Sequence, residues 1–145
     1  MIKVIKMGFF DKFSSSVELT PTIALSASMI YMMSSDGDIA DEEMNYLFVT
    51  LNALGDVRNI VDNAVKFAKK NSLEEFISKA NTLLNNEQKM VIVSNLADLL
   101  LSDGSAEPEE EALFFRFVDG WSVAHDDVEV IINAIGIKNN YSILA

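Results

Sequence analysis

An acidic, glycine-centred segment occurs twice in the chain, as SSDGDIADEE at residues 34–43 and as LSDGSAEPEE at residues 101–110. In each copy an aspartate precedes the glycine, and a glutamate follows seven residues after that aspartate. Carboxylates that cluster without a basic neighbour repel one another, and hard divalent cations such as Ca²⁺ or Mg²⁺ relieve this repulsion by taking oxygen ligands. The repeated spacing therefore suggests a site for a divalent cation.

An EF-hand is the first cation site to compare with these segments. If Gly37 is placed at position 6 of an EF-hand loop, Asp36 and Glu43 fall at positions 5 and 12, as that loop requires. Position 1 is then Met32, and Leu99 in the second copy, and neither side chain offers an oxygen ligand. This comparison excludes an EF-hand.

The same residues also suit a purely structural role as helix caps. Each glycine follows a long helical pattern and can adopt the left-handed conformation that ends a helix. The glutamates after it fall in the first turn of the next helix, where the helix dipole and the free N–H groups favour negative charge. The residues concerned are Gly37, Gly104, Glu42, Glu43, Glu109 and Glu110. Capping and cation binding are therefore two open interpretations.

The elements that carry these segments are helices. Apolar residues recur with the i, i+3, i+4, i+7 spacing along most of the chain, and no alternating strand pattern of useful length occurs. The sequence SLEE predicts a capping box in which Ser72 and Glu75 bond reciprocally to the backbone. The chain is predicted to be all-α, a single compact domain of about seven helices. These helices are expected at residues 20–34, 40–54, 57–70, 72–84, 87–101, 107–121 and 125–137.

The chain also matches itself well beyond the acidic segments when Gly37 is aligned with Gly104. The apolar pattern of residues 23–33 then coincides with that of residues 90–100, and the coincidence continues into two further helices. This internal repeat predicts two three-helix units related by a pseudo-twofold axis, with one shared core. The units span about residues 20–70 and 87–137, the helix at 72–84 connects them, residues 20–145 form the domain, and residues 1–19 form an N-terminal segment.

The paired SDG turns, each followed by a glutamate at matching spacing within a duplicated helical chain, resemble the TerB-like family associated with tellurite resistance. The resemblance covers about residues 20–140, including GIKNN at 136–140, and extends to the start MGFFDKF. It implies a compact seven-helix domain with a divalent-metal site built from the acidic turns. It also implies a cytoplasmic stress-response role linked to membrane proteins of the TerC type. The metal ligands that it implies are Asp36, Asp38, Glu43, Asp103 and Glu110.

The second copy departs from a symmetric metal site at one of these positions. The counterpart of Asp38 is Ser105, so a symmetric pair of sites is not expected.

The composition argues against several other classes of protein. With 11 basic and 22 acidic residues the net charge is -11, which repels phosphate backbones, so we expect no nucleic-acid partner. The chain has no cysteine, which excludes disulfides, thiolate metal sites and a cysteine nucleophile and fits a reducing compartment. The longest apolar-leaning run, residues 23–33, is too short to span a membrane, so no membrane insertion is expected.

The N-terminal residues MIKVIKMGFFDKF do not predict a signal peptide, because charge interrupts their apolar stretch. Met7 is an alternative start to Met1. A short helix packed on its own domain is preferred here to an amphipathic segment that touches a membrane surface. We therefore expect a cytoplasmic protein, with a peripheral position at the inner membrane as the alternative.

Chemistry elsewhere in the chain is sparse. His125 is the only histidine, and because no nucleophile or second histidine accompanies it, a surface or helix-capping role is preferred to catalysis. No phosphate-binding loop, nucleophile elbow or histidine-rich zinc signature occurs, so we expect no enzyme and no catalytic residues. Trp121, in the aromatic-rich sequence FFRFVDGW, is expected to close the core.

The sequence thus predicts a non-enzymatic TerB-like domain that binds a divalent cation through its two acidic turns. We expect it to dock to a protein partner, with a TerC-type membrane protein as the candidate. The alternative is a helical protein-interaction module in which the acidic turns only cap helices.

Overall fold

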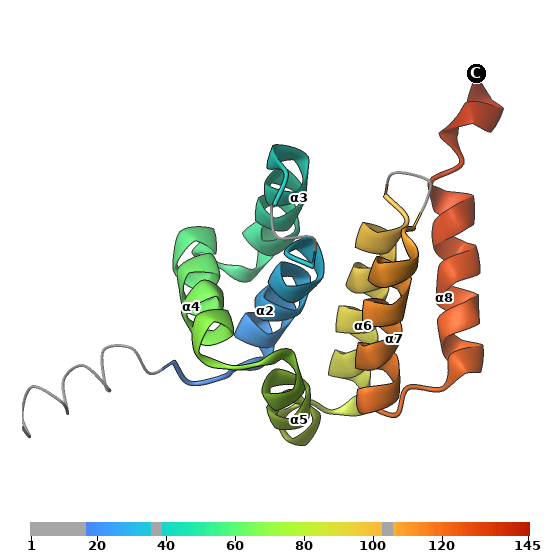
Figure 1. Ribbon diagram of the computed structural model, residues 1–145. Helices are drawn as coiled ribbons and strands as arrows, with labels where there is room; N and C mark the ends of the chain where they lie inside the picture. Colours follow the sequence, from blue (N-terminus) through green and yellow to red (C-terminus); the bar gives the residue numbers. More distant parts are fainter. Residues whose placement is uncertain (1–16, 36–38, 103–105) are drawn as a thin grey trace, which may run out of the picture.

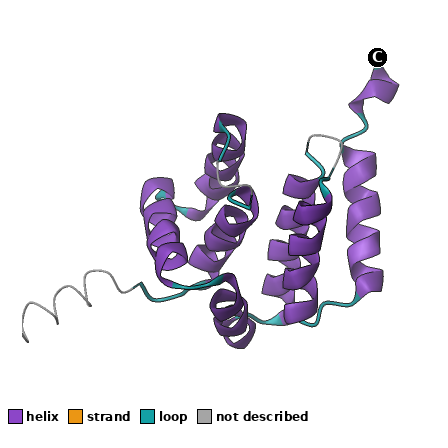
Figure 2. Ribbon diagram, viewed as in Figure 1, coloured by secondary structure: helices purple, strands orange, loops and turns teal. Residues whose placement is uncertain are grey.

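The computed structural model describes residues 17–35, 39–102 and 106–145, and these residues are mostly helical (Figure 1 and Figure 2). No β-strand occurs within these ranges, which confirms the prediction of an all-α fold. The α-helices are α2 (Pro21–Met33), α3 (Asp41–Leu51), α4 (Val57–Lys70), α5 (Leu73–Leu83), α6 (Asn86–Leu100), α7 (Pro108–Gly120) and α8 (His125–Lys138). Two short 3-10 helices, η1 (Asn52–Leu54) and η2 (Tyr141–Leu144), follow α3 and α8.

All seven predicted helices occur, and their ends differ from the prediction by at most three residues. The largest difference is at α3, which ends at Leu51 because the tighter η1 replaces its last turn. The predicted capping box forms at the start of α5. There Ser72 Oγ accepts the Glu75 N–H at 3.1 Å, and Glu75 Oε1 accepts the Ser72 N–H at 3.3 Å. Local sequence signals therefore define most of the helix boundaries.

Helix α2 is the centre of the fold. It packs against α4 on one side and against α6 on the other (Figure 1), and nearly all of its side chains from Ile23 to Met33 are buried. Helix α6 in turn packs against α7 and α8. A helix that is apolar on all faces belongs in the interior, which explains the central position of α2. The two groups of helices, α2–α4 and α6–α8, share one hydrophobic core.

Helix α5 joins the two groups and packs against α2 and α7. The buried ring of Phe76 lies edge-on to the rings of Phe117 and Trp121, with centroids 6.3 and 6.4 Å away. Trp121 is only 2% exposed, and its indole Nε1 donates a hydrogen bond of 3.1 Å to the Ile77 carbonyl. A Cβ on Gly120 would lie 2.5 Å from Ile77 Cγ2, so this close approach requires glycine. Trp121 closes the core, as predicted.

The helix boundaries of α2–α4 recur in α6–α8 to within two residues when Gly37 is aligned with Gly104. Within the described ranges, positive φ angles occur at Gly55 (132°) and Ser122 (54°), and the same alignment places these two residues at equivalent positions. Each of them lies shortly before the third helix of its group. The coincidence supports the predicted duplication, which stays a prediction.

None of the described helices has both the length and the apolar content to cross a membrane. Helix α6, the longest of them, has 15 residues, whereas a spanning helix needs about 20.

Candidate functional site

A pocket of about 440 Å³ lies where four helix ends meet. Helices α2 and α6 end beside it, and α3 and α7 begin beside it, so both acidic segments border the same pocket. Helix C-termini and N-termini carry opposite partial charges, which offset one another here and leave the side chains to determine the local potential. The polar residues that line the pocket are Ser35, Glu42, Glu43, Tyr46, Ser102 and Glu110. We call this space the acidic pocket.

Two of the five predicted ligands, Glu43 and Glu110, line the acidic pocket. The other three, Asp36, Asp38 and Asp103, lie outside the described residues. Within the part of the chain that the structure describes, no group of three or more histidine, cysteine, aspartate and glutamate side chains could hold a metal ion. The five-residue ligand set therefore stays a prediction.

Glu43 acts as a helix cap. Its Oε1 accepts a hydrogen bond of 3.2 Å from the Ala40 N–H, at the start of α3. A carboxylate offers about four lone-pair positions, so this bond leaves most of the acceptor capacity of Glu43 for another partner. The capping role predicted for Glu43 is confirmed, and it is compatible with cation binding.

The predicted glycine caps, Gly37 and Gly104, lie outside the described residues. The C-cap residues are Ser34 for α2 and Leu101 for α6, with nearly equal φ angles of -91° and -98°. Next to the second of them, Ser102 Oγ donates to the Leu99 carbonyl at 2.8 Å. Because its proton is used in this bond, the Ser102 oxygen keeps its lone pairs for a ligand in the pocket.

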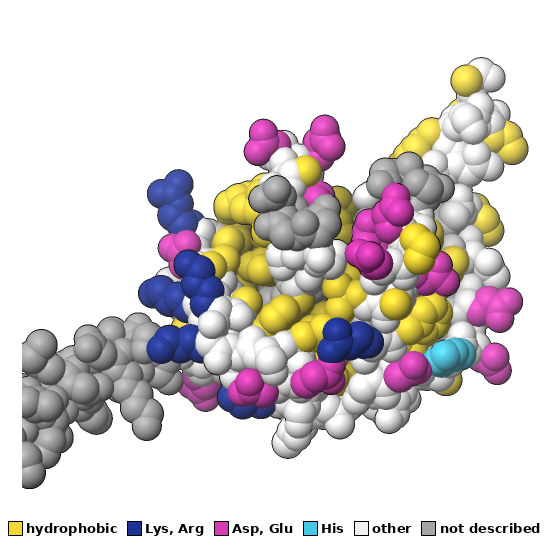
Figure 3. Space-filling model, in the orientation of Figure 1, with side chains coloured by type: hydrophobic (Ala, Val, Ile, Leu, Met, Phe, Trp, Pro, Cys, Tyr) yellow, Lys and Arg dark blue, Asp and Glu magenta, His cyan; other side chains and the backbone are white. Residues whose placement is uncertain are grey.

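The donor chemistry of the acidic pocket suits a hard cation. Its polar lining consists of carboxylate and hydroxyl oxygens, the ligand types that Ca²⁺ and Mg²⁺ prefer. The chain has no cysteine, and its single histidine does not line this pocket. Acidic side chains gather at the starts of α3 and α7 (Figure 3). The oxygen ligand types of this lining are those of the predicted class of cation, and binding itself stays a prediction.

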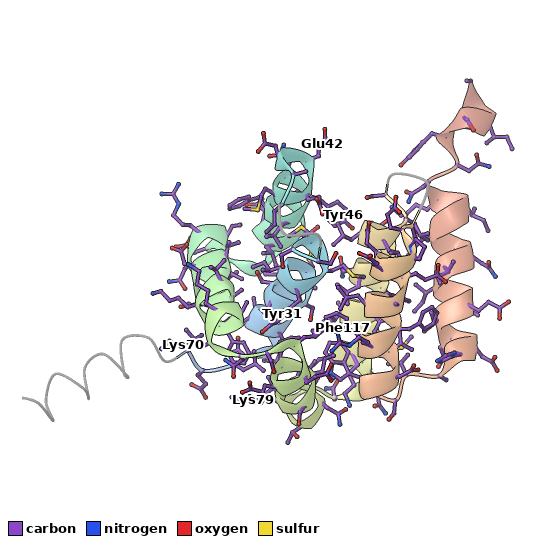
Figure 4. The ribbon with its side chains drawn as sticks, in the orientation of Figure 1. Tyr31, Glu42, Tyr46, Lys70, Lys79 and Phe117 are labelled. Carbon is purple, nitrogen blue, oxygen red and sulfur yellow. The ribbon has the colours of Figure 1, made fainter. Side chains whose placement is uncertain are left out.

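A polar network behind the acidic pocket was missed by the sequence analysis. Tyr46, which lines the pocket, points from α3 toward α6 (Figure 4), and its hydroxyl donates to Asp98 Oδ2 at 2.6 Å. The Asn139 amide donates to Asp98 Oδ1 at 3.2 Å, and Lys138 Nζ lies 3.5 Å from the same oxygen. Asp98 thus connects the wall of the pocket with the end of α8. The available signal was an aspartate that interrupts the apolar run NLADLL.

These contacts change the acidity of both partners. Burial raises the pKa of the Asp98 carboxyl, but the hydrogen bonds from Tyr46 and Asn139 and the charge of Lys138 outweigh burial and hold this pKa below its ordinary value. Burial, followed by the hydrogen bond to the Asp98 carboxylate, raises the pKa of the Tyr46 hydroxyl well above its usual range. Tyr46 therefore stays a neutral hydrogen-bond donor and Asp98 a charged acceptor.

His125 lies away from the acidic pocket, as the first residue of α8. Its side chain is exposed, and its Nε2 lies 2.6 Å from Asp119 Oδ1. Its ring lies 5.3 Å from the ring of Phe115. The predicted surface position of this histidine is confirmed.

A family model described as Tellurite resistance protein TerB matches residues 22–132, which is most of the chain and includes both acidic segments. Neither the search of curated proteins nor the search of solved structures found a match.

Proposed function

The chain belongs to the TerB family and is a tellurite-resistance-associated domain, and we propose that it is a non-enzymatic protein that binds a divalent cation in the acidic pocket. One observation carries this proposal: Glu42 and Glu43 from the first acidic segment and Glu110 from the second line the same pocket. Ca²⁺ or Mg²⁺ is the expected ion, because the polar lining offers carboxylate and hydroxyl oxygens.

A cation in this pocket would connect the two groups of helices. The carboxylates of α3 and α7 belong to different groups and line the same pocket, and like charges that share a pocket repel each other. An ion that both carboxylates coordinate would replace this repulsion by attraction and strengthen the contact between the groups. Asp36, Asp38 and Asp103, which the family resemblance implies as ligands, would complete the oxygen shell.

A second function is favoured by the hydrogen bond from the Ala40 N–H to Glu43. If capping is the whole role of the acidic segments, the protein is a helical interaction module without a cation. Removing the carboxylates would then lower stability slightly, because a helix cap contributes about 1 kcal/mol, and addition of metal would have no effect.

Isothermal titration calorimetry with Ca²⁺ and with Mg²⁺ separates these two functions. For a cation site we expect saturable heat, together with stabilisation of about 2.7 kcal/mol when the free metal reaches about 100 times its Kd. The double variant Glu43→Gln and Glu110→Gln should lose both effects. The matched control is Glu129→Gln, an exposed glutamate outside the pocket, which should bind as the wild type does. Absence of heat from the wild type, with an unchanged melting temperature in millimolar metal, would leave capping as the function.

Docking to a protein partner is the other part of the proposed function. Large apolar side chains are exposed at the end of α8 and along η2, where hydrophobic surface is visible beside the C-terminus (Figure 3). The residues are Ile137, Tyr141, Ile143 and Leu144. Several large exposed apolar side chains within one short segment are a feature of protein-binding sites. A TerC-type membrane protein is the candidate partner, which would place a cytoplasmic protein at the inner surface of the membrane.

Co-purification with a TerC-type membrane protein in detergent tests this docking. The variant Ile143→Ser with Leu144→Ser should weaken the association without unfolding the domain, because both side chains are exposed. Val49→Ser changes an equally exposed apolar residue on α3 and serves as the control. Equal recovery of the partner with all three proteins would contradict docking through this segment.

A further inference from the structure

Lys89, which has no partner among the described residues, lies at the end of α6 opposite to the acidic pocket. Lys89, in the first turn of α6, is only 9% exposed. Its ammonium group has neither a hydrogen bond nor an ion pair with any residue that the structure describes. The side chain lines a pocket of about 220 Å³. Among the described residues, only Ser26 Oγ is a fully buried side-chain N or O atom without a partner, so the Lys89 ammonium reaches solvent and its three N–H donors are accessible to a ligand. We call this space the Lys89 pocket.

Two helix starts border the same pocket. Asn86, the first residue of α6, and Ala124, the N-cap of α8, both line it. The N-terminus of a helix carries partial positive charge and free N–H groups, which attract anions. Asn85 provides a side-chain cap for α6, whereas Ala124 makes no side-chain hydrogen bond to α8. The start of α8 therefore has unused capacity to accept a negatively charged group beside Lys89.

The remaining lining limits which anion fits. Asp127, whose side chain is exposed, brings one negative charge to the pocket, and this charge opposes a doubly charged anion more strongly than a singly charged one. The partly exposed side chains of Met90 and Val123 give the pocket an apolar wall that suits a short hydrocarbon chain, and the nearly fully buried Trp121 also lines it. The volume of about 220 Å³ admits only a small molecule. A singly charged group attached to a short apolar chain matches all three features.

We propose that the Lys89 pocket binds a small aliphatic carboxylate, whose carboxylate group pairs with the Lys89 ammonium while its hydrocarbon part contacts Met90 and Val123, close to the buried Trp121. This site is independent of the proposed cation site, because the two pockets share no lining residue and lie at opposite ends of α6. One site is built for a cation and the other for an anion.

The intrinsic fluorescence of Trp121 tests the proposal directly, since this is the only tryptophan in the chain and it lines the pocket. We expect sodium propionate, titrated against the full chain at constant ionic strength, to change the emission saturably. Sodium chloride over the same range should not. A response to propionate that is absent or not saturable, or that chloride reproduces, would overturn the proposal.

Substitution of Lys89 identifies the group that binds. Lys89→Met keeps the bulk of the stem and removes the ammonium, so propionate affinity should fall by about tenfold or more, the loss expected of a charge-assisted hydrogen bond. Lys66→Met, outside this pocket on α4, is the matched control and should bind propionate as the wild type does. Equal affinity of Lys89→Met and the wild type would overturn the proposal.

A second variant keeps the test decisive if Lys89→Met does not fold. Asp127→Asn retains Lys89 and removes the opposing carboxylate, so inorganic phosphate should bind this variant more tightly than it binds the wild type. Propionate should bind the wild type more tightly than phosphate does. Tighter binding of phosphate than of propionate by the wild type, or unchanged phosphate affinity in Asp127→Asn, would overturn the assignment to a carboxylate.

Discussion

The two groups of helices, α2–α4 and α6–α8, follow the same layout but differ in how deeply a residue that follows the second helix is buried. Leu54 and Trp121 occupy equivalent positions, directly before the residues with positive φ. Leu54 is 47% exposed, whereas Trp121 is buried and donates to the Ile77 carbonyl of α5. Helix α5 packs against α7, to which Trp121 is the C-cap. A shared helical pattern thus sets the layout of both groups, and the burial of Trp121 against α5 gives the second group a contact that Leu54 does not give the first.

A second pair of equivalent positions differs in charge. In the first group the Tyr31 hydroxyl donates to the Asn71 carbonyl at 2.6 Å. The equivalent positions in the second group are Asp98 and Lys138, whose charged groups lie 3.5 Å apart. The same link between the first and third helices of a group is thus neutral in one case and ionic in the other. The stabilisation that the neutral link provides should change little as the pH falls, whereas the stabilisation from the ionic link should decrease strongly.

A third difference concerns the start of the third helix in each group. Asp56 caps α4 by accepting the Asn59 N–H at 3.4 Å, whereas the N-cap of α8, Ala124, has no side chain that can do so. The uncapped start of α8 borders the Lys89 pocket, and the capped start of α4 does not. The group whose third helix lacks a side-chain cap is thus also the group whose third helix borders the Lys89 pocket.

The largest effect that separates the two groups is expected at the equivalent positions Trp121 and Leu54. Trp121→Ala removes a buried ring and its hydrogen bond, and should lower the free energy of unfolding by about 3–5 kcal/mol. Leu54→Ala removes a half-exposed side chain and should cost less than about 1 kcal/mol, since little of its surface is buried. Urea unfolding followed by circular dichroism measures both, because this signal does not depend on tryptophan.

Trp121→Phe is the control for this pair. It keeps an aromatic ring in the core and loses the hydrogen bond to Ile77, so its cost should lie between those of the two alanine variants. If Trp121→Ala and Leu54→Ala destabilise the protein equally, the burial of Trp121 does not distinguish the stability of the two groups, and the comparison fails.

The layout of the fold was predictable from sequence because it depends on local signals. Apolar periodicity predicts all seven helices, and the Ser72–Glu75 capping box predicts Ser72 as the N-cap of α5, as observed. Glu43 was recognised as a capping residue because acidic side chains in a first helical turn have a local physical reason to be there. These features need no knowledge of which helices touch.

The polar networks were not predictable, because they depend on contacts between residues far apart in sequence. Tyr46 and Asp98 are 52 residues apart, and nothing in the sequence near either residue indicates its partner. Lys89, within NEQKM, reads as an ordinary exposed helix residue, and only the packing of α6 beside Trp121 and the start of α8 buries it. A lysine is buried through tertiary structure, which periodicity does not describe.

The ionic link of the second group should respond to acid. The pKa of Asp98 is lower in the folded protein than its ordinary value of 3.8, so its ionised form stabilises the fold above that pH. This stabilisation is lost as the pH falls through the folded pKa. Asp98→Asn should therefore lower stability at pH 7 by about 2 kcal/mol, as expected for hydrogen bonds to a charged group. As the pH falls below about 5, the stability of this variant should decrease less than that of the wild type. Urea titrations at several pH values measure both.

The neutral link of the first group provides the opposite test. Burial, with a smaller contribution from the charge of Glu75, raises the pKa of the Tyr31 hydroxyl from 10.0 to about 12. Its contribution to stability is complete below pH 10 and is lost as the pH rises through about 12. Tyr31→Phe should cost about 1 kcal/mol at pH 7 and leave the acid response unchanged. If Tyr31→Phe altered the acid response as Asp98→Asn does, the two links would not be chemically distinct.

The smallest effects are expected at the two residues with positive φ, Gly55 and Ser122. At Gly55 a Cβ would meet no atom within 4 Å, so the cost of Gly55→Ala comes from the backbone alone, with φ at 132°, and should be about 1 kcal/mol. Ser122, with φ at 54°, already bears such a cost, and Ser122→Gly should raise stability by less than about 1 kcal/mol. The gain is limited because glycine also makes the unfolded chain more flexible. Thermal unfolding of both variants beside the wild type measures these opposite signs. A loss of stability in Ser122→Gly would mean that the Ser122 side chain stabilises this turn by more than its backbone conformation costs.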